Sequence, residues 1–152
     1  MAFHSEISFQ RGGEVEVCSK VPEYIGSYFE ATIVARKGNN YVVQYKNLVE
    51  EYDESVPLKE KVMADEVRPL PPEVTEATEF HVGTRVDAYD LDGWWVGTIY
   101  SERNVYGYHL VFFETTGEVL PYSLRELRVH QEWRNGKWDV SSTKRKRLPL
   151  ML

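Results

Sequence analysis

Cysteine is nearly absent from the sequence, whose 152 residues include a single one, Cys18. An internal disulfide framework is therefore excluded, and the chain fits a reducing compartment. The four histidines are scattered, at positions 4, 81, 109 and 130. With one cysteine they give none of the spacings of a zinc site. We therefore expect neither a bound metal nor a cofactor.

Long apolar runs are missing too. No segment approaches the roughly 18 consecutive apolar residues of a membrane-spanning helix, and the first residues lack the charged and apolar regions of a signal peptide. Gly12–Gly13 and Gly117 do not stand in the sequence pattern of a phosphate-binding loop. The sequence also shows no recognisable catalytic set of a nucleophile, a base and a residue that orients the base. These absences predict an intracellular, soluble protein with no place in a membrane, and they argue against an enzyme.

Positive charge is scarce outside one cluster. The net charge is −6, and Lys144–Arg147 alone contribute +4, so the other residues carry −10. An acidic surface favours basic partners such as histone tails and disfavours the phosphate backbone of DNA. The basic cluster predicts either a nuclear-localisation signal or a nucleic-acid contact, with a solubilising tail as the alternative. Direct DNA binding is therefore expected, if at all, only through that cluster.

What the sequence does contain is a repeat. Tyr28–Ile33 and Trp94–Ile99 lie 66 residues apart, and each is an aromatic pair, one variable residue, a small residue, Thr and Ile. Three other pairs of segments recur in the same order: Phe9 with Gly13–Val17 and Phe80 with Gly83–Ala88, 70 to 71 residues apart; Tyr41–Tyr45 and Tyr108–Phe112, 67 apart; Glu66–Arg68 and Glu126–Arg128, 60 apart. Four matches in one order indicate two copies of one small module.

The composition of both copies is typical of short strands and turns. Residues 13–18 alternate between apolar and charged side chains, as a half-buried strand does. Further strands are expected over 28–36 and 40–46, with a tight turn at 37–40. The acid-rich segment 48–57 is too polar for a core strand, and we expect it to be a loop or a short edge strand.

These elements predict an all-β fold without long helices. We expect two small, strongly bent antiparallel β-barrels in tandem that pack as one block. The prolines of Pro69–Pro72 end regular structure and mark the boundary between the copies. The first domain is then 9–72 and the second 80–138, and 139–152 form a basic, flexible tail.

The repeated pattern resembles the Agenet domain. The residues that carry the resemblance are, in order, Gly13 with its alternating strand, the aromatic pair with its Thr-Ile, Tyr41–Tyr45 and Val67–Pro72. The closing segment Arg128–Trp138 is similar to the end of a tandem Agenet pair. The resemblance covers about residues 9–138. It implies the Tudor-like fold of the Royal superfamily, in the branch that is enriched in plants.

The resemblance also implies a function. Tandem Agenet proteins of this kind are nuclear chromatin readers, and some recognise histone H3 methylated at lysine 9 and take part in heterochromatin formation and transcriptional silencing. A methylated histone H3 tail is thus the expected partner, and the nucleus the expected location. Two other classes stay open: an interaction module that binds an unmodified protein, and a nucleic-acid-binding module.

Aromatic residues would carry the binding of a methylated lysine, because ring faces attract a poorly hydrated cation by roughly 0.5–2 kcal/mol each. In Tudor-like modules these rings lie at one end of the barrel. The cage that the resemblance implies for the first unit consists of Tyr24, Tyr28, Phe29, Tyr45 and Asn47. The second cage or peptide surface, in the second unit, consists of Tyr89, Trp94, Trp95, Phe112 and Glu114.

Each of these aromatic residues could instead belong to the core. Neighbours in a strand point to opposite faces, so one member of each aromatic pair is expected to be packed. The Tudor pattern favours Phe29 and Trp95 for the cages. The first strand of a Tudor module usually ends on an aromatic residue, but here Ser19 and Asp90 stand closest to that position. We therefore expect one cage to be incomplete, and we favour the first unit as the methyl-lysine site.

Acidic residues form a predicted rim for the rest of a basic peptide. They are Glu50, Glu51, Asp53, Glu54, Asp90 and Asp92. For any single one of them a solvated loop is the simpler interpretation, but together they fit a histone tail. Trp133 and Trp138 are expected to be structural.

Overall fold

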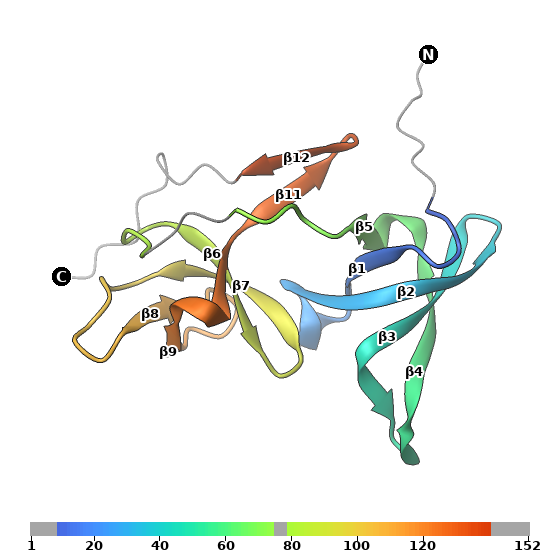
Figure 1. The fold of residues 1–152 in the computed structure, drawn as a ribbon, viewed down its shortest axis with the longest axis horizontal. Coiled ribbons are helices and arrows are strands. Elements are labelled where there is room, and N and C mark those ends of the chain that lie inside the picture. Colours follow the sequence, from blue (N-terminus) through green and yellow to red (C-terminus); the bar gives the residue numbers. More distant parts are fainter. Residues whose placement is uncertain (1–8, 75–78, 141–152) are drawn as a thin grey trace. The chain divides into compact units, whose positions relative to one another are not determined.

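The computed structural model describes residues 9–74 and 79–140 (Figure 1). These residues divide into two compact units, the first built mainly from residues before Pro72 and the second mainly from residues after Pro71. Regular structure in the described residues consists of strands and three single-turn 3-10 helices, so the predicted all-β class is confirmed. No helix in these stretches is long and apolar enough to cross a membrane. The predicted tail lies outside the described residues from position 141 onward.

The first unit is a five-stranded antiparallel sheet (Figure 1). Its strands are β1 (Glu14–Cys18), β2 (Ser27–Lys37), β3 (Asn40–Glu50), β4 (Asp53–Met63) and β5 (Val67–Pro69), with 3-10 turns at Pro22–Tyr24 and Ala64–Glu66. They are hydrogen-bonded in the order β5-β1-β2-β3-β4. Among the described pairings, β4 pairs with β3 alone and β5 with β1 alone. The unit is therefore an open sheet, bent at a β-bulge in β2, rather than the closed barrel that we expected.

Alternate side chains of β1, β2 and β3 fill the core of this unit. The buried residues on the inner face are Val15, Val17, Phe29, Ala31, Ile33, Tyr41, Val43 and Tyr45. The register pairs Val17 with Phe29 across β1 and β2, and Ala31 with Tyr45 across β2 and β3. This register places Phe29 and Tyr45 on one face, at one end of the sheet.

The acid-rich segment 48–57 is not a loop. Strand β3 continues to Glu50 and β4 begins at Asp53, so two eleven-residue strands form one long hairpin (Figure 1). We expected either a loop or a short edge strand. Strand β4 is an edge strand, but it is long rather than short. Apolar periodicity does not reveal this hairpin, because strands that extend past the core satisfy their backbone groups by pairing and need no buried side.

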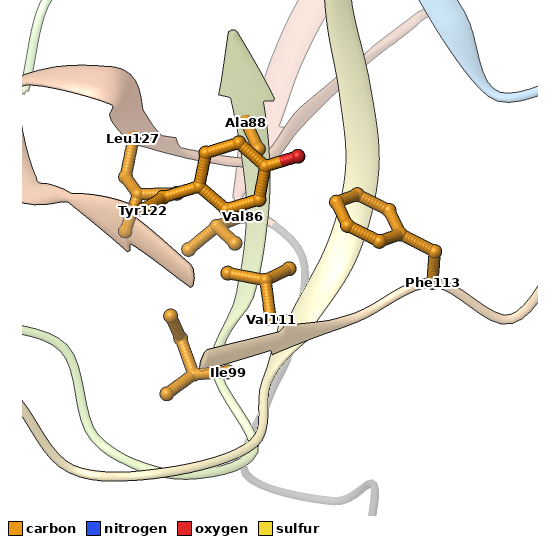
Figure 2. Packing of buried hydrophobic residues seen from close by; sticks show 7 residues of the cluster. All are labelled: Val86, Ala88, Ile99, Val111, Phe113, Tyr122 and Leu127. Atoms are coloured by element: carbon orange, nitrogen blue, oxygen red, sulfur yellow. The ribbon is translucent and has the colours of Figure 1, made fainter. Parts of the chain in front are cut away.

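The second unit has the same strand order. Its strands are β6 (Arg85–Asp90), β7 (Gly93–Ile99), β8 (Tyr108–Phe112), β9 (Val119–Ser123) and β10 (Leu127–Val129), in the order β10-β6-β7-β8-β9, with a 3-10 turn at Leu124–Glu126. Seven buried side chains converge in its core: Val86, Ala88, Ile99, Val111, Phe113, Tyr122 and Leu127 (Figure 2). Strands β11 (Gln131–Arg134) and β12 (Lys137–Val140) form a separate hairpin, on which the rings of Trp133 and Trp138 lie 5.1 Å apart.

Equivalent contacts occur in both units, and they correct one spacing of the sequence repeat. The backbone N–H of Phe9 donates to the Tyr41 hydroxyl at 3.0 Å, and that of Phe80 donates to Nε2 of His109 at 3.1 Å. The ring pairs Phe9–Tyr41 and Phe80–His109 are edge-on at 5.9 and 6.0 Å. Tyr41 therefore corresponds to His109, a spacing of 68 residues and not the 67 expected from matching residue types.

The corrected spacing changes the counterpart of Tyr45. It is Phe113, which is buried and packs edge-on against Tyr122 at 5.9 Å. Phe112, the predicted counterpart, lies on the other side of the strand, where its ring is 6.5 Å from that of Tyr100. Two consecutive phenylalanines fit an aromatic position equally well, so residue type alone could not separate them.

Candidate functional site

Three aromatic rings gather at one end of the first unit, each from a different segment. Phe29 on β2 contacts both Tyr24, in the connection between β1 and β2, and Tyr45 on β3. The Tyr24 and Phe29 centroids are 6.3 Å apart with ring planes at 84°, and those of Phe29 and Tyr45 are 6.4 Å apart at 87°. Both contacts are edge-to-face, and Phe29 is the ring that they share. The three residues therefore form a candidate aromatic site.

A carboxylate adjoins these rings. Strand β4 places Glu60 opposite Val43 of β3, and the Tyr45 hydroxyl donates to Oε1 of Glu60 at 2.6 Å. Burial, the bond to Glu60 and the charge of that carboxylate together raise the pKa of Tyr45 above its usual value, so the phenol is protonated at neutral pH. The site thus combines aromatic faces with one negative charge.

Exposure differs sharply within the group. Phe29 is 8% exposed and Tyr45 6%, whereas Tyr24 is 48% exposed. The two strand-borne rings are covered, and Tyr24 is the member that faces solvent. Asn47, another predicted cage residue, is exposed on β3, two residues beyond Tyr45.

Tyr28 lies on the opposite face of β2 from Phe29. The guanidinium carbon of Arg68, on β5, is 3.6 Å from the centroid of the Tyr28 ring. Arg68 also donates to Oε1 of Glu16, from Nε at 3.0 Å and from Nη2 at 2.7 Å, and both side chains of this ion pair are buried. The chain thus supplies its own cation to Tyr28, and the structure separates this predicted cage residue from the group around Phe29.

The second unit repeats this arginine cluster. Arg128 on β10 lies over the ring of Trp94, 4.2 Å from its centroid, and its Nε donates to Oδ2 of Asp87 at 2.8 Å. The residues are 66, 60 and 71 positions after Tyr28, Arg68 and Glu16, which are spacings of the sequence repeat. Because it occurs twice, the cluster is a feature of the fold that ties together the first, second and fifth strands of each unit.

A histidine extends the cluster of the second unit. Nδ1 of His130 bonds to Oδ1 of Asp87 at 2.7 Å, and Nε2 bonds to Oε2 of Glu132 at 2.5 Å. Burial by itself lowers the pKa of His130, but the hydrogen bonds and charges of Asp87 and Glu132 outweigh burial and raise it above 6.5. The corresponding position of the first unit, 60 residues earlier, is the apolar Leu70.

We expect the stability of the second unit to fall as the pH rises through the neutral range. The protonated His130 ring stabilises the fold because its pKa is raised on folding. This contribution is complete below the unfolded pKa near 6.5 and is lost as the pH rises through the folded pKa. Urea-unfolding midpoints measured between about pH 6 and 9 should therefore decline. His130→Gln should flatten the decline, and the exposed control His81→Gln should not; an unchanged slope in His130→Gln would contradict the assignment.

The second unit also contains a cavity of about 270 Å³. Its lining consists of Tyr89, Asp90, Leu120, Pro121, Tyr122 and Glu126. The Tyr122 hydroxyl donates to Oδ2 of Asp90 at 2.7 Å, and Glu126 accepts the backbone N–H of Ser123 at 2.8 Å. Two tyrosine rings, two carboxylates and an apolar side suit a basic side chain with an aliphatic stem.

The predicted residues of the second unit are dispersed. Trp95 packs against the core, and its Nε1–H donates to the backbone carbonyl of Asp90 at 2.8 Å. Tyr89 contacts Trp94 at 5.0 Å and lines the cavity. Phe112 lies on the outer side of β8, and Glu114 is exposed in the turn that follows. Of the five, Tyr89 lines the cavity described above.

Four of the six predicted acidic contacts lie together, at the tip of the β3–β4 hairpin: Glu50, Glu51, Asp53 and Glu54. Ser55 donates its hydroxyl and its backbone N–H to Oδ1 of Asp53, at 2.7 and 2.9 Å, and these bonds lower the pKa of Asp53. Asp90 lines the cavity of the second unit, and Asp92 is exposed in the turn between β6 and β7. The acidic tip belongs to the same hairpin as Tyr45.

Sequence reasoning missed two kinds of site residue. Glu60, which is exposed, was overlooked, although alternation places it on the same side of β4 as the buried Val62. The buried partners Glu16 and Asp87 were interpreted only as the polar positions of a strand. The recurrence of an arginine at positions 68 and 128, in the closing segment of each copy, was the available signal for a repeated ion pair.

Comparison with known sequences agrees with this architecture. The family model for the Agenet domain matches residues 12–72. Protein AGENET DOMAIN (AGD)-CONTAINING P1 of Arabidopsis thaliana is 37% identical over 135 residues, which are 88% of this chain and 26% of that protein. DUF724 domain-containing protein 3 of the same plant is 32% identical over 130 residues, 82% of this chain and 18% of that protein. The chain thus spans about a quarter or less of the length of these curated relatives.

Solved structures extend the match to both units. The crystal structure of Arabidopsis thaliana AGDP1 AGD34 superposes with a TM-score of 0.82 at 30% identity, covering 88% of this chain and 90% of that one. The crystal structure of the ADCP1 tandem Agenet domain 3-4 gives 0.78 at 30% identity, with 88% and 89% covered. Agenet domains of this type are protein- and histone-interaction modules. With its internal repeat, the chain belongs to the Agenet family and consists of Tudor-like Agenet units in tandem.

Proposed function

We propose that this chain is a chromatin reader whose first unit binds a methylated lysine of a histone tail. The observation that carries the proposal is the group of Tyr24, Phe29 and Tyr45, with the Glu60 carboxylate at the Tyr45 hydroxyl. Methylation keeps the positive charge of lysine but weakens its hydration, so aromatic faces compete better with water. A carboxylate beside the rings attracts the charge and accepts the N–H that mono- and dimethyl-lysine retain.

The rest of the ligand is proposed to be a basic peptide. The carboxylates at the tip of the β3–β4 hairpin support this, since they provide a dense negative charge on the strands that carry Tyr45 and Glu60. We assign a second basic side chain to the cavity lined by Asp90 and Glu126 in the second unit. From the Agenet resemblance, histone H3 methylated at lysine 9 is the first candidate ligand, and heterochromatin silencing in the nucleus the proposed role.

The test is calorimetric binding to histone H3 peptides that are unmodified or mono-, di- or trimethylated. We expect methyl-dependent binding, and Tyr24→Ala should weaken it roughly 3- to 30-fold, the range of one cation–π contact. Because Tyr24 is half exposed, this change should leave the fold intact. The matched control is Tyr106→Ala, which removes a tyrosine that is 80% exposed in the second unit and should not alter affinity.

A second candidate function is binding of an unmodified protein partner. The low exposure of Phe29 and Tyr45 favours it, since rings that are only packed in a core would be covered in this way. It predicts equal affinity across the methylation series. A flat series would overturn the methyl-lysine proposal and leave this alternative.

A further inference from the structure

We propose that Ser27 is a positioning residue for the aromatic site, because its hydroxyl holds Tyr24 at the edge of Phe29. The segment between β1 and β2, residues 19–26, is called the β1–β2 loop here. The inference deepens the proposed function and rests on it, since Tyr24 matters only if the site takes a ligand. It concerns how the one exposed ring of the site is kept in place.

Bonds within the β1–β2 loop shape it locally. The backbone N–H of Val21 donates to the Ser19 hydroxyl at 3.0 Å, and that of Tyr24 donates to the carbonyl of Val21 at 2.8 Å. Gly26, with φ of +84°, turns the chain into β2. An exposed ion pair between Lys20 and Asp65 is also present, and such pairs contribute little.

Ser27 connects this loop to the sheet. It is the first residue of β2 and is fully buried, at 0% exposure. Its hydroxyl donates to the backbone carbonyl of Tyr24 at 2.5 Å. A buried group on a rigid strand thus holds the backbone of the residue whose ring faces solvent, so the position of that ring relative to Phe29 depends on this bond.

The second unit lacks this arrangement in the described structure. Its first two strands are joined by Leu91 and Asp92 alone, at φ of 49° and 64°, as in a two-residue hairpin turn. The residue 66 positions after Ser27 is Gly93, which has no hydroxyl. The eight-residue β1–β2 loop is therefore what distinguishes the first unit, and it brings the third aromatic ring.

A double-mutant cycle tests the proposal. The affinity for a dimethylated histone H3 peptide is measured for the chain without substitutions, for Ser27→Ala, for Tyr24→Ala and for the double variant. One buried hydrogen bond is worth about a fivefold change in affinity, so Ser27→Ala should weaken binding by about that factor. In the Tyr24→Ala background it should cost nothing further, because Ser27 acts through Tyr24. Ser101→Ala, which removes a serine hydroxyl bonded to a backbone carbonyl in the second unit, is the matched control.

Hydrogen exchange in the free protein supplies a second readout. Ser27→Ala should speed exchange of the Tyr24 amide and leave the central amides of β2 unchanged. Equal losses of affinity in both backgrounds, or unaltered exchange at Tyr24, would overturn the role of Ser27. A chain without substitutions that shows no methyl-dependent binding would instead overturn the proposed function, and with it any role of Tyr24 in a ligand site.

Discussion

Glu16→Ala is expected to lower the free energy of unfolding by about 3–5 kcal/mol, the usual cost of removing one partner from a buried ion pair. Glu16 is fully buried, and it accepts hydrogen bonds from Arg68 at 3.0 and 2.7 Å. Its loss would leave the guanidinium buried over Tyr28 without its counter-charge. Urea unfolding at neutral pH measures the effect.

Two controls separate the buried charge from other causes. Glu30→Ala removes a carboxylate from the neighbouring strand, where Glu30 pairs with Lys46 at 3.3 Å on the surface, and should cost less than about 1 kcal/mol. The double variant Glu16→Met with Arg68→Met removes both charges and should recover much of the lost stability. A Glu16→Ala variant as stable as Glu30→Ala would show that the ion pair does not support the fold.

The repeated arginine clusters explain one of the two consecutive aromatic residues near the start of each unit's second strand. The first of the pair, Tyr28 or Trp94, stacks under the arginine of the closing strand. The second, Phe29 or Trp95, lies on the other face of the same strand. The first residue thus serves the ion-pair cluster, whereas the second contacts Tyr24 and Tyr45 in the first unit and packs against the core in the second.

The units then diverge around that second residue. In the first unit Tyr45 and Glu60 supply a hydroxyl bonded to a carboxylate. Their counterparts by position, Phe113 and Leu120, are apolar and pack in or against the core. The polar half of the candidate site is thus a property of the first unit, and the cavity of the second unit is built from other residues.

Much of the fold followed from local sequence signals. The turn at Gly38 and the existence of strand β1 were predicted because both have signals in neighbouring residues. The half-buried character expected of β1 was wrong, since Glu16 is buried as well as Val15 and Val17. The open sheet and the long β3–β4 hairpin were not predicted. Strand closure and hairpin extension depend on pairing between distant segments, which leaves little trace in the periodicity of either one.

The candidate site could be predicted only in part. Tyr24, Phe29 and Tyr45 were singled out because the resemblance pointed to aromatic residues at strand ends. Glu60 was not, since a charged residue on an edge strand has the same sequence appearance whether or not it meets a tyrosine hydroxyl. The proposed role of Ser27 depends on a hydrogen bond from its side chain to the backbone of the β1–β2 loop, and no residue pattern predicts such a bond.

Glu60→Gln is expected to change which methylation states the chain binds best. Glutamine preserves the shape of the side chain and can accept the Tyr45 hydroxyl through its amide oxygen, but it removes the negative charge beside the rings. Hydrogen bonds to charged groups are worth about 1.5–3 kcal/mol, so affinity for mono- and dimethylated peptides should fall about tenfold or more. Trimethyl-lysine has no N–H to donate and should lose less affinity, so the preference shifts toward it.

Calorimetry across the methylation series measures the shift in preference. Glu14→Gln, which changes an exposed carboxylate on β1, is the control. Equal losses for all methylated forms would mean that Glu60 acts by charge alone and does not select among them.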